Sequence, residues 1–317
     1  MKDAIAAIVA DAEAAFDGRV WPAHELDDEV TAEDHVGIYL GNAGMLWALR
    51  RLGSTFEVPI AVDVVRDDPS LLVGETGVLL VTREDDTRLQ ALVDANAENP
   101  TWDLLWGSPG TIIAARHAGL DASRSAELLV AARDADGLWT QTIGGKPTRY
   151  IGAAHGFAAN IHALRGHVPD DELRPWVESV LREHAIWEDG VVNWPPIPGM
   201  PGERVQWCHG APGIVATLGD LMPEDLLLAA AERTWRTGPL EKGPGLCHGT
   251  AGNGYALLKT YAITGDAQWL ERARVFADAA LGQVQHRYSL FTGDIGAALF
   301  AQSCLDEDAR FPILDVV

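Results

Sequence analysis

The sequence predicts an all-α protein, an α/α toroid in which seven inner helices form a barrel and seven outer helices surround it. Three observations predict this fold. A four-residue box of small residues recurs seven times along the chain. An apolar run rich in alanine and leucine follows each box, and amphipathic runs lie between the boxes. A single domain over residues 1–317 is therefore expected.

Each of these glycine boxes begins with a glycine, and six of the seven also end with one. Successive first glycines are 33, 33, 49, 54, 39 and 44 residues apart, and each spacing accommodates one helix pair. Seven pairs can close into a ring or stack as an open solenoid. The boxes are Gly41–Gly44, Gly74–Gly77, Gly107–Gly110, Gly156–Ala159, Gly210–Gly213, Gly249–Gly252 and Gly293–Gly296.

The segment 266–281 is the clearest outer helix in the sequence. Trp269, Ala273, Phe276 and Ala280 fall on one helical face, and Asp266 is placed to cap the first turn. Two other segments, 136–150 and 189–201, combine Asp-Gly pairs, β-formers and prolines. They are expected to be hairpins or irregular loops at the mouth of the barrel.

The charge balance excludes some partners. The chain has 24 basic and 46 acidic residues, a net charge of −22, so it offers no basic surface to nucleic acid or anionic membranes. No apolar run approaches the roughly 20 residues that a membrane helix needs. The N-terminus is typical of an amphipathic helix and not of a signal peptide, so a cytoplasmic location is expected. Three cysteines argue against a disulfide framework.

Cysteine and histidine stand directly before the first box glycine in three successive repeats. These are His155, the pair Cys208-His209 and the pair Cys247-His248. Because equivalent repeat positions lie in one region of a closed barrel, the pattern predicts two thiols and three imidazoles at one mouth. Zinc prefers such ligands, and three protein ligands with an open fourth position are typical of a catalytic zinc site.

The sequence alone also allows other interpretations of these cysteines and histidines than a catalytic zinc site. The cysteines could be buried core residues, since a free cysteine packs as a small hydrophobe. His209 could close a structural site as a fourth ligand. Cys304 lies in an apolar run without a partner motif and is expected in the core.

Five motifs resemble those of the lanthionine cyclases (LanC) and their eukaryotic LanC-like relatives, and the resemblance covers essentially the whole chain. It implies an α/α toroid with one zinc ion in the mouth. It also implies addition of cysteine thiols to dehydroalanine or dehydrobutyrine in peptides, or addition of glutathione as in the LanC-like branch. The motifs are WDLLWGSPG (102–110), GAAHG (152–156), WCHGAPG (207–213), GLCHGTAGNGY (245–255) and YSLFTGDIG (288–296).

The resemblance also assigns roles to single residues. Cys208, Cys247 and His248 match the zinc ligands of the family. His155 matches its proposed acid/base histidine, and Asp103 matches an acidic residue near that histidine.

Four further residues match site positions of the family. Arg204 corresponds to a site arginine, and Lys242 and Arg287 are implied to bind the glutathione cofactor. His209 stands where peptide cyclases carry tyrosine, so WCHG is similar to the glutathione-binding LanC-like branch, and His209 is a further catalytic candidate. The short interval between the third and fourth boxes has no room for a peptide-recognition insertion.

The expected reaction is a Michael-type addition, whose partners are a dehydroamino-acid-containing peptide or protein and a thiol, either a peptide cysteine or glutathione. The alternative is a non-catalytic, regulatory module that binds zinc and glutathione or a peptide. A carbohydrate-active toroid is disfavoured, because it would need a pair of carboxylates, and no acid pair stands out at box positions beyond Asp103 and Asp294.

Overall fold

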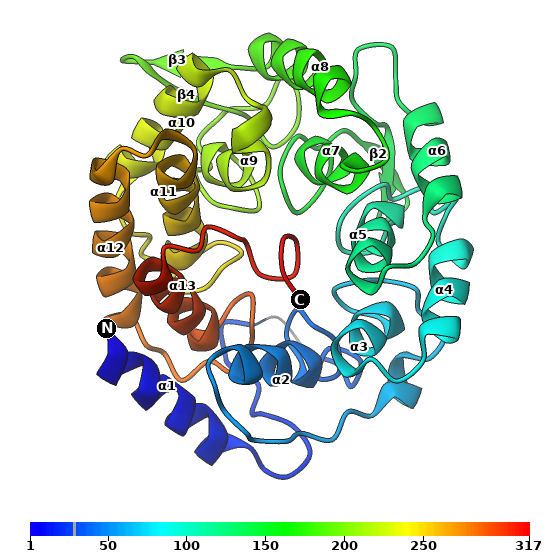
Figure 1. Cartoon of the computed structure of the whole chain (residues 1–317), viewed down its shortest axis with the longest axis vertical. Coiled ribbons are helices and arrows are strands. Elements are labelled where there is room, and N and C mark those ends of the chain that lie inside the picture. Colours follow the sequence, from blue (N-terminus) through cyan, green and yellow to red (C-terminus); the bar gives the residue numbers. More distant parts are fainter. Residues whose placement is uncertain (28–29) are drawn as a thin grey trace.

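The computed structural model describes residues 1–27 and 30–317, and its helices surround a common axis in two concentric rings (Figure 1). The inner ring contains one α-helix after each glycine box, and the first glycine of the box is the N-cap of that helix. These inner helices are α2 (Asn42–Arg51), α3 (Glu75–Thr82), α5 (Ser108–Ala118), α7 (Phe157–Leu164), α9 (Ala211–Leu218), α11 (Thr250–Thr264) and α13 (Asp294–Asp306).

The outer ring confirms the toroid with one difference from the predicted set of helices. In the described part of the chain, the position between α2 and α3 holds only a four-residue 3-10 helix, η1 (Val62–Val65). This stretch lies between Pro59 and Pro69 and is rich in β-branched valine, which disfavours an α-helix. The outer α-helices are α1 (Lys2–Ala15), α4 (Asp86–Ala95), α6 (Ser123–Ala131), α8 (Asp170–Glu183), α10 (Glu224–Thr237) and α12 (Ala267–Leu281).

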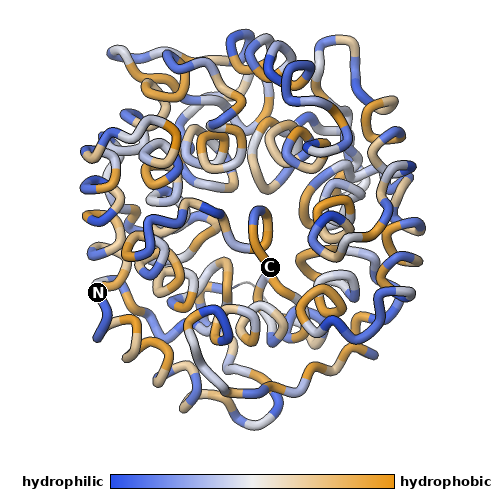
Figure 2. Tube along the Cα trace, in the orientation of Figure 1, coloured by the Kyte–Doolittle hydropathy of each residue, from blue (hydrophilic) through white to orange (hydrophobic). Residues whose placement is uncertain are grey.

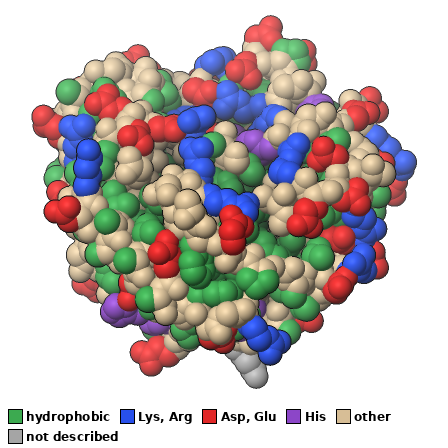
Figure 3. All heavy atoms as spheres, turned by 60° about the horizontal axis from the view of Figure 1, so that its bottom comes forward, with side chains coloured by type: hydrophobic (Ala, Val, Ile, Leu, Met, Phe, Trp, Pro, Cys, Tyr) green, Lys and Arg blue, Asp and Glu red, His purple; other side chains and the backbone are tan. Residues whose placement is uncertain are grey.

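The short 3-10 helix leaves the outer wall thin at this point. A cavity of about 510 Å³ is lined there by Val20, Val36, Ile60 and Val64, among others, and Val64 is 41% exposed. Figure 3 turns this side of the molecule forward, and apolar side chains gather below its middle, among interspersed acidic and basic groups.

Burial differs between the two rings as the hydropathy pattern predicts (Figure 2). Every residue of α7 and of α9 is buried, whereas the outer helix α8 buries only one face. The prediction for segment 266–281 is confirmed. Its four expected core residues are all buried in α12, and the Asp266 side chain accepts a hydrogen bond from the backbone of Gln268.

The glycines of the boxes are needed because backbone segments approach closely there. A Cβ atom on Gly213 would lie 1.7 Å from the carbonyl oxygen of Trp207. Gly156 and Gly210 also have φ values of 104° and 118°, which L-residues with a side chain rarely adopt. The fourth and fifth boxes, which carry His155 and Cys208-His209, therefore depend on glycine for their backbone conformation.

Six of the seven boxes, all but the fourth, are joined in series by backbone hydrogen bonds at one equivalent position, the second residue before the first box glycine. We call this series of bonds the box ring. It brings the equivalent positions of successive repeats into contact, so residues far apart in sequence become neighbours at the mouth. Its bonds run from Cys208 N to Cys247 O (3.0 Å), Cys247 N to Phe291 O (2.8 Å), Phe291 N to Tyr39 O (3.3 Å), Tyr39 N to Leu72 O (2.8 Å) and Leu72 N to Leu105 O (3.4 Å).

Both segments that were expected to be hairpins or loops contain a two-stranded antiparallel hairpin. In the first, β1 (Gln141–Ile143) pairs with β2 (Lys146–Thr148) through a turn at residues 144–145, downstream of the Asp-Gly pair at 136–137. In the second, β3 (Ile186–Glu188) pairs with β4 (Val191–Asn193), and the Asp-Gly pair at 189–190 forms the turn.

The last residues of the chain turn into the centre of the barrel (Figure 1). The Phe311 ring stacks on Trp207, with ring centroids 4.7 Å apart. His117, His162 and Arg116, near the C-terminal ends of inner helices, lie within hydrogen-bond distance of the Leu314 carbonyl oxygen. No helix in the described residues is long and apolar enough to span a membrane.

Candidate functional site

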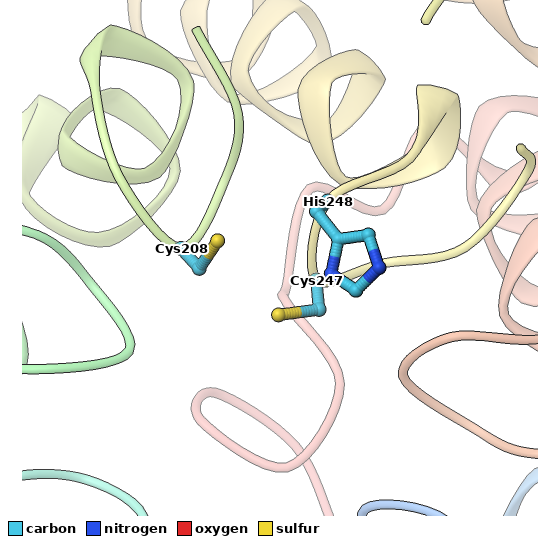
Figure 4. A group of neighbouring side chains, drawn as sticks. All are labelled: Cys208, Cys247 and His248. Atoms are coloured by element: carbon cyan, nitrogen blue, oxygen red, sulfur yellow. The ribbon is translucent and has the colours of Figure 1, made fainter. Parts of the chain in front are cut away.

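Cys208, Cys247 and His248 converge at the mouth of the barrel. Their ligand atoms all lie within 4.8 Å of one another. Figure 4 shows the two sulfur atoms directed toward each other, with the His248 ring beside Cys247. Both cysteines are buried free thiols, and His248 is partly buried. The three residues predicted from the repeat positions therefore do lie together.

The box ring explains this convergence. Cys208 and Cys247 occupy the same ring position in successive repeats, and the backbone bond between them fixes the two thiols side by side. A tetrahedral zinc ion with Zn–S distances of about 2.3 Å separates two sulfur ligands by roughly 3.8 Å. The donor separations fit this geometry with a small contraction, so the group can hold such an ion.

The electrostatics of the group favour a thiolate. A hydrogen bond from Cys247 lowers the pKa of the Cys208 thiol, and Gln206, Lys242 and Arg204 act in the same direction. The same Cys208–Cys247 hydrogen bond raises the pKa of Cys247. Burial lowers the pKa of His248, which keeps its imidazole neutral, the form that binds metals.

Lys242 and Gln206 form a polar chain that ends at Cys208. The Lys242 ammonium donates to Gln206 Oε1 at 3.1 Å, and Gln206 Nε2 donates to Cys208 Sγ at 2.9 Å. Lys242 is therefore linked to Cys208 through a glutamine that the sequence did not single out. Gln206 belongs to the tight turn that precedes the fifth box, where its backbone exchanges two 3.1 Å hydrogen bonds with His209.

His155 and Asp103 form a hydrogen-bonded pair whose imidazole lies against His209, the residue that follows Cys208. Asp103 is fully buried, and its Oδ2 lies 2.7 Å from His155 Nδ1. Its Oδ1 accepts hydrogen bonds from the backbone N–H groups of Trp106 and Gly107, so the carboxylate is fixed on both sides. The imidazole is thereby oriented through Nδ1, which leaves Nε2 for proton transfer.

His209 joins an aromatic wall instead of the metal group. The centroid of its ring lies 5.9 Å from that of His155 and 5.4 Å from that of Tyr150. The Trp106 ring stacks in turn on His155. Burial, together with His155 and Arg204, lowers the pKa of His209 to about 4. The group of three ligands does not include His209, which disfavours a closed four-ligand structural site among the described residues.

The two remaining candidates have different environments. Arg204 is exposed and lies close enough to Cys208 and His209 to lower the pKa of both. Arg287 is buried, and its guanidinium donates to the Asp27 carboxylate and to the backbone carbonyl of Leu26. Cys304 is buried in α13, as expected for a core residue.

Besides Gln206, two residues of the site were missed, although the repeat held a signal for one of them. Tyr39 occupies the ring position of the cysteines in the first box, stacks on Phe291 and lies close enough to Cys247 to lower the pKa of that thiol. Alignment of all seven boxes on the first glycine would have identified it. Asp27 lies in a segment outside the repeat, so it has no equivalent position in other repeats from which its role could have been inferred.

Comparisons with known proteins agree with this architecture. The family model described as "Lanthionine synthetase C-like protein" matches residues 84–316. The solved structure of "Nisin cyclase" superimposes with a TM-score of 0.60 at 16% identity, over 95% of this chain and 93% of that one. At this identity the likeness shows the fold, and it agrees with the toroid.

Two curated relatives match about half of the chain. "Glutathione S-transferase LANCL1" of Danio rerio is 34% identical over 190 residues, which are 53% of this chain and 46% of the relative. "LanC-like protein GCL1" of Arabidopsis thaliana is 33% identical over 189 residues, or 52% and 43%. The match thus spans less than half the length of these relatives. With the family match over most of the chain, these findings confirm the resemblance: the chain belongs to the lanthionine synthetase C-like family.

Proposed function

We propose that this protein activates a thiol at a single zinc ion and adds it to dehydroalanine or dehydrobutyrine, forming a thioether. The observation that carries the proposal is the convergence of Cys208, Cys247 and His248, together with the oriented His155–Asp103 pair, which contacts His209 directly after Cys208. Two thiolates and one imidazole are zinc ligands, and a set of three leaves a position for substrate. A purely structural core would not need an oriented acid/base pair beside them.

The site supplies what a Michael-type addition requires. Bound zinc would lower the pKa of a coordinating thiol, whose ordinary value of about 8.5 leaves little thiolate at neutral pH. The sulfur attacks the β-carbon, the carbon–carbon π bond breaks, and its electron pair moves onto the carbonyl oxygen. Arg204, which is exposed and close to Cys208 and His209, is the proposed group that stabilises that oxygen.

His155 completes the reaction as a general acid. Protonated His155 delivers its Nε2 proton to the α-carbon, and Asp103 stabilises the imidazolium through Nδ1 at 2.7 Å. The proton released from the thiol balances the one delivered. The rings of Trp106, Tyr150 and His209 pack against His155 and limit its contact with water.

Glutathione or another small acidic thiol is the favoured nucleophile. Lys242 is exposed and lies one side chain away from the Cys208 thiol, where it is available to a carboxylate, and one relative carries glutathione S-transferase in its name. The acceptor is a peptide or protein that contains a dehydroamino acid.

The test is turnover by the zinc-loaded protein on a dehydroalanine peptide with glutathione. Mass spectrometry should show a glutathione adduct whose rate of formation falls when a chelator removes the metal. Tight thiol binding by zinc-loaded protein without any adduct would replace this proposal with the non-catalytic binding module.

A further inference from the structure

Arg287 lies beside the metal group, but its side chain is already engaged. Its Nε donates to Asp27 Oδ1 at 3.0 Å, its Nη2 donates to the same oxygen, and the two side chains are 5% and 9% exposed. Thr292 Oγ1 donates to Asp27 Oδ1 at 3.1 Å and lies 2.6 Å from the hydroxyl of Ser289. A guanidinium and a hydroxyl thus form a socket that holds one carboxylate.

The socket borders the metal group through the box ring. Thr292 stands directly before the seventh box glycine, the position that His248 holds in the sixth box. The preceding residue, Phe291, accepts the backbone hydrogen bond of Cys247. Arg287 and Asp27 both lie near enough to His248 to influence its pKa. A carboxylate in this socket is therefore a neighbour of the proposed thiol position.

The carboxylate that fills the socket comes from an exposed turn. Asp27 N donates to the carbonyl of His24, and between these two residues Glu25 is exposed and Leu26 is 56% exposed. Among Glu25, Leu26 and Asp27, only the Asp27 side chain is largely buried. Withdrawal of this side chain would therefore open the socket without removing a large apolar surface from the core.

We propose that Asp27 occupies, from within the chain, the position on Arg287 and Thr292 that a carboxylate of the thiol substrate takes, so that acidic thiols bind by displacing it. This inference rests on the proposed function, since it names the substrate class of the same site. Asp27 is then a specificity-determining residue. It weakens the binding of acidic thiols, because any external carboxylate competes with one that is tethered nearby.

The experiment uses full-length, zinc-loaded protein with Asp27→Ala and Asp27→Asn. The probe is S-methylglutathione, which has the carboxylates of glutathione but no free thiol. Both variants should bind it at least about tenfold more tightly than the original protein, as measured by calorimetry. In addition, sodium acetate should raise the melting temperature of Asp27→Ala but not that of the unchanged protein, with sodium chloride as the ionic-strength control.

Asp220→Ala is the matched control. Asp220 accepts hydrogen bonds from Arg165, in a partly buried pair at the other end of the barrel. Its removal should give no gain in affinity for S-methylglutathione. If Asp27→Ala does not fold, Asp27→Asn carries the test, because the amide keeps the shape and a hydrogen bond while losing the charge.

Equal or weaker binding of S-methylglutathione by the Asp27 variants would overturn the inference and make Asp27 a fixed structural partner of Arg287. An equal gain in the Asp220 control would also overturn it. Failure of the proposed function gives a different result, in which no variant forms a thioether whatever its affinity for S-methylglutathione.

Discussion

Histidines and charged residues lie at both ends of the barrel, but the hydrogen-bond partners of these side chains differ between the two ends. At the mouth, two thiols and an imidazole face one another, and His155 has one ring nitrogen held by Asp103. At the other end, His162 lies within hydrogen-bond distance of the carbonyls of Thr217 and Leu314 and of Arg116. At the far end, groups of the protein itself serve as partners of His162. At the mouth, the thiols and the second ring nitrogen of His155 are available to a metal ion or a substrate. Residue type alone does not distinguish a site from a satisfied core.

The largest expected effect is on metal content at the mouth. Cys208→Ala or Cys247→Ala should reduce bound zinc from about one ion per chain to nearly none, because two remaining ligands do not retain the ion. Elemental analysis after dialysis measures this. Cys304→Ala, which removes a buried thiol outside the group, should keep its zinc. A full complement of zinc in either mouth variant would refute the ligand assignment.

The next effect separates chemistry from metal binding. His155→Ala should lower the rate of thioether formation by about 10²–10⁴-fold, the usual contribution of a general acid, and leave zinc content unchanged. Asp103→Asn should lower the rate less, since the amide keeps the backbone hydrogen bonds from Trp106 and Gly107. The readout is single-turnover kinetics on a dehydroalanine peptide. Unaltered rates in His155→Ala would remove this residue from the mechanism.

The far end should instead control acid stability. Burial lowers the pKa of His162 to about 4, below its ordinary value of about 6.5 in the unfolded chain. Between these values the unfolded state binds a proton that the folded state does not. Stability is therefore lost as the pH falls from about 6.5 to 4, by up to roughly 3 kcal/mol from this residue.

Urea unfolding at neutral and acidic pH measures this effect. In His162→Gln the loss of stability on acidification should be smaller than in the unchanged protein, while zinc content stays the same. Part of the acid sensitivity remains, because the pKa of His209 is also lowered to about 4. An identical pH dependence in the variant would show that His162 does not titrate in this way.

The smallest effect concerns the polar chain to Cys208. Gln206→Ala removes the hydrogen bond to Sγ and should weaken zinc binding by about tenfold, as substitutions around metal ligands commonly do. Lys242→Ala leaves that bond intact and should have less effect. Competition with a chromophoric chelator ranks the two variants. A greater loss in Lys242→Ala would mean that charge and not the glutamine hydrogen bond stabilises the thiolate.

The toroid and the convergence of the metal group were predictable because both follow from the repeat. Equal positions in successive boxes must meet when the ring closes, and Cys208 and Cys247 do. The positions of residues within the repeat did not predict the structure of the segments that connect the repeats. The β-branched segment at 62–65 forms only a 3-10 turn where an outer helix was expected. The engagement of Arg287 by Asp27 depends on a contact across 260 residues that no local pattern encodes.

The box ring also has a consequence for the order of assembly. Cys247 N is fixed by the carbonyl of Phe291, and Phe291 N by that of Tyr39, so one ligand is positioned through contacts with both the first and the last repeat. A ribosome releases Cys208 and Cys247 before Phe291, and the two thiols do not have this support until the last inner helix has docked. If the three residues hold zinc as proposed, high-affinity binding would require α13 to be docked, and a nascent chain that stops short of α13 should exchange its metal readily.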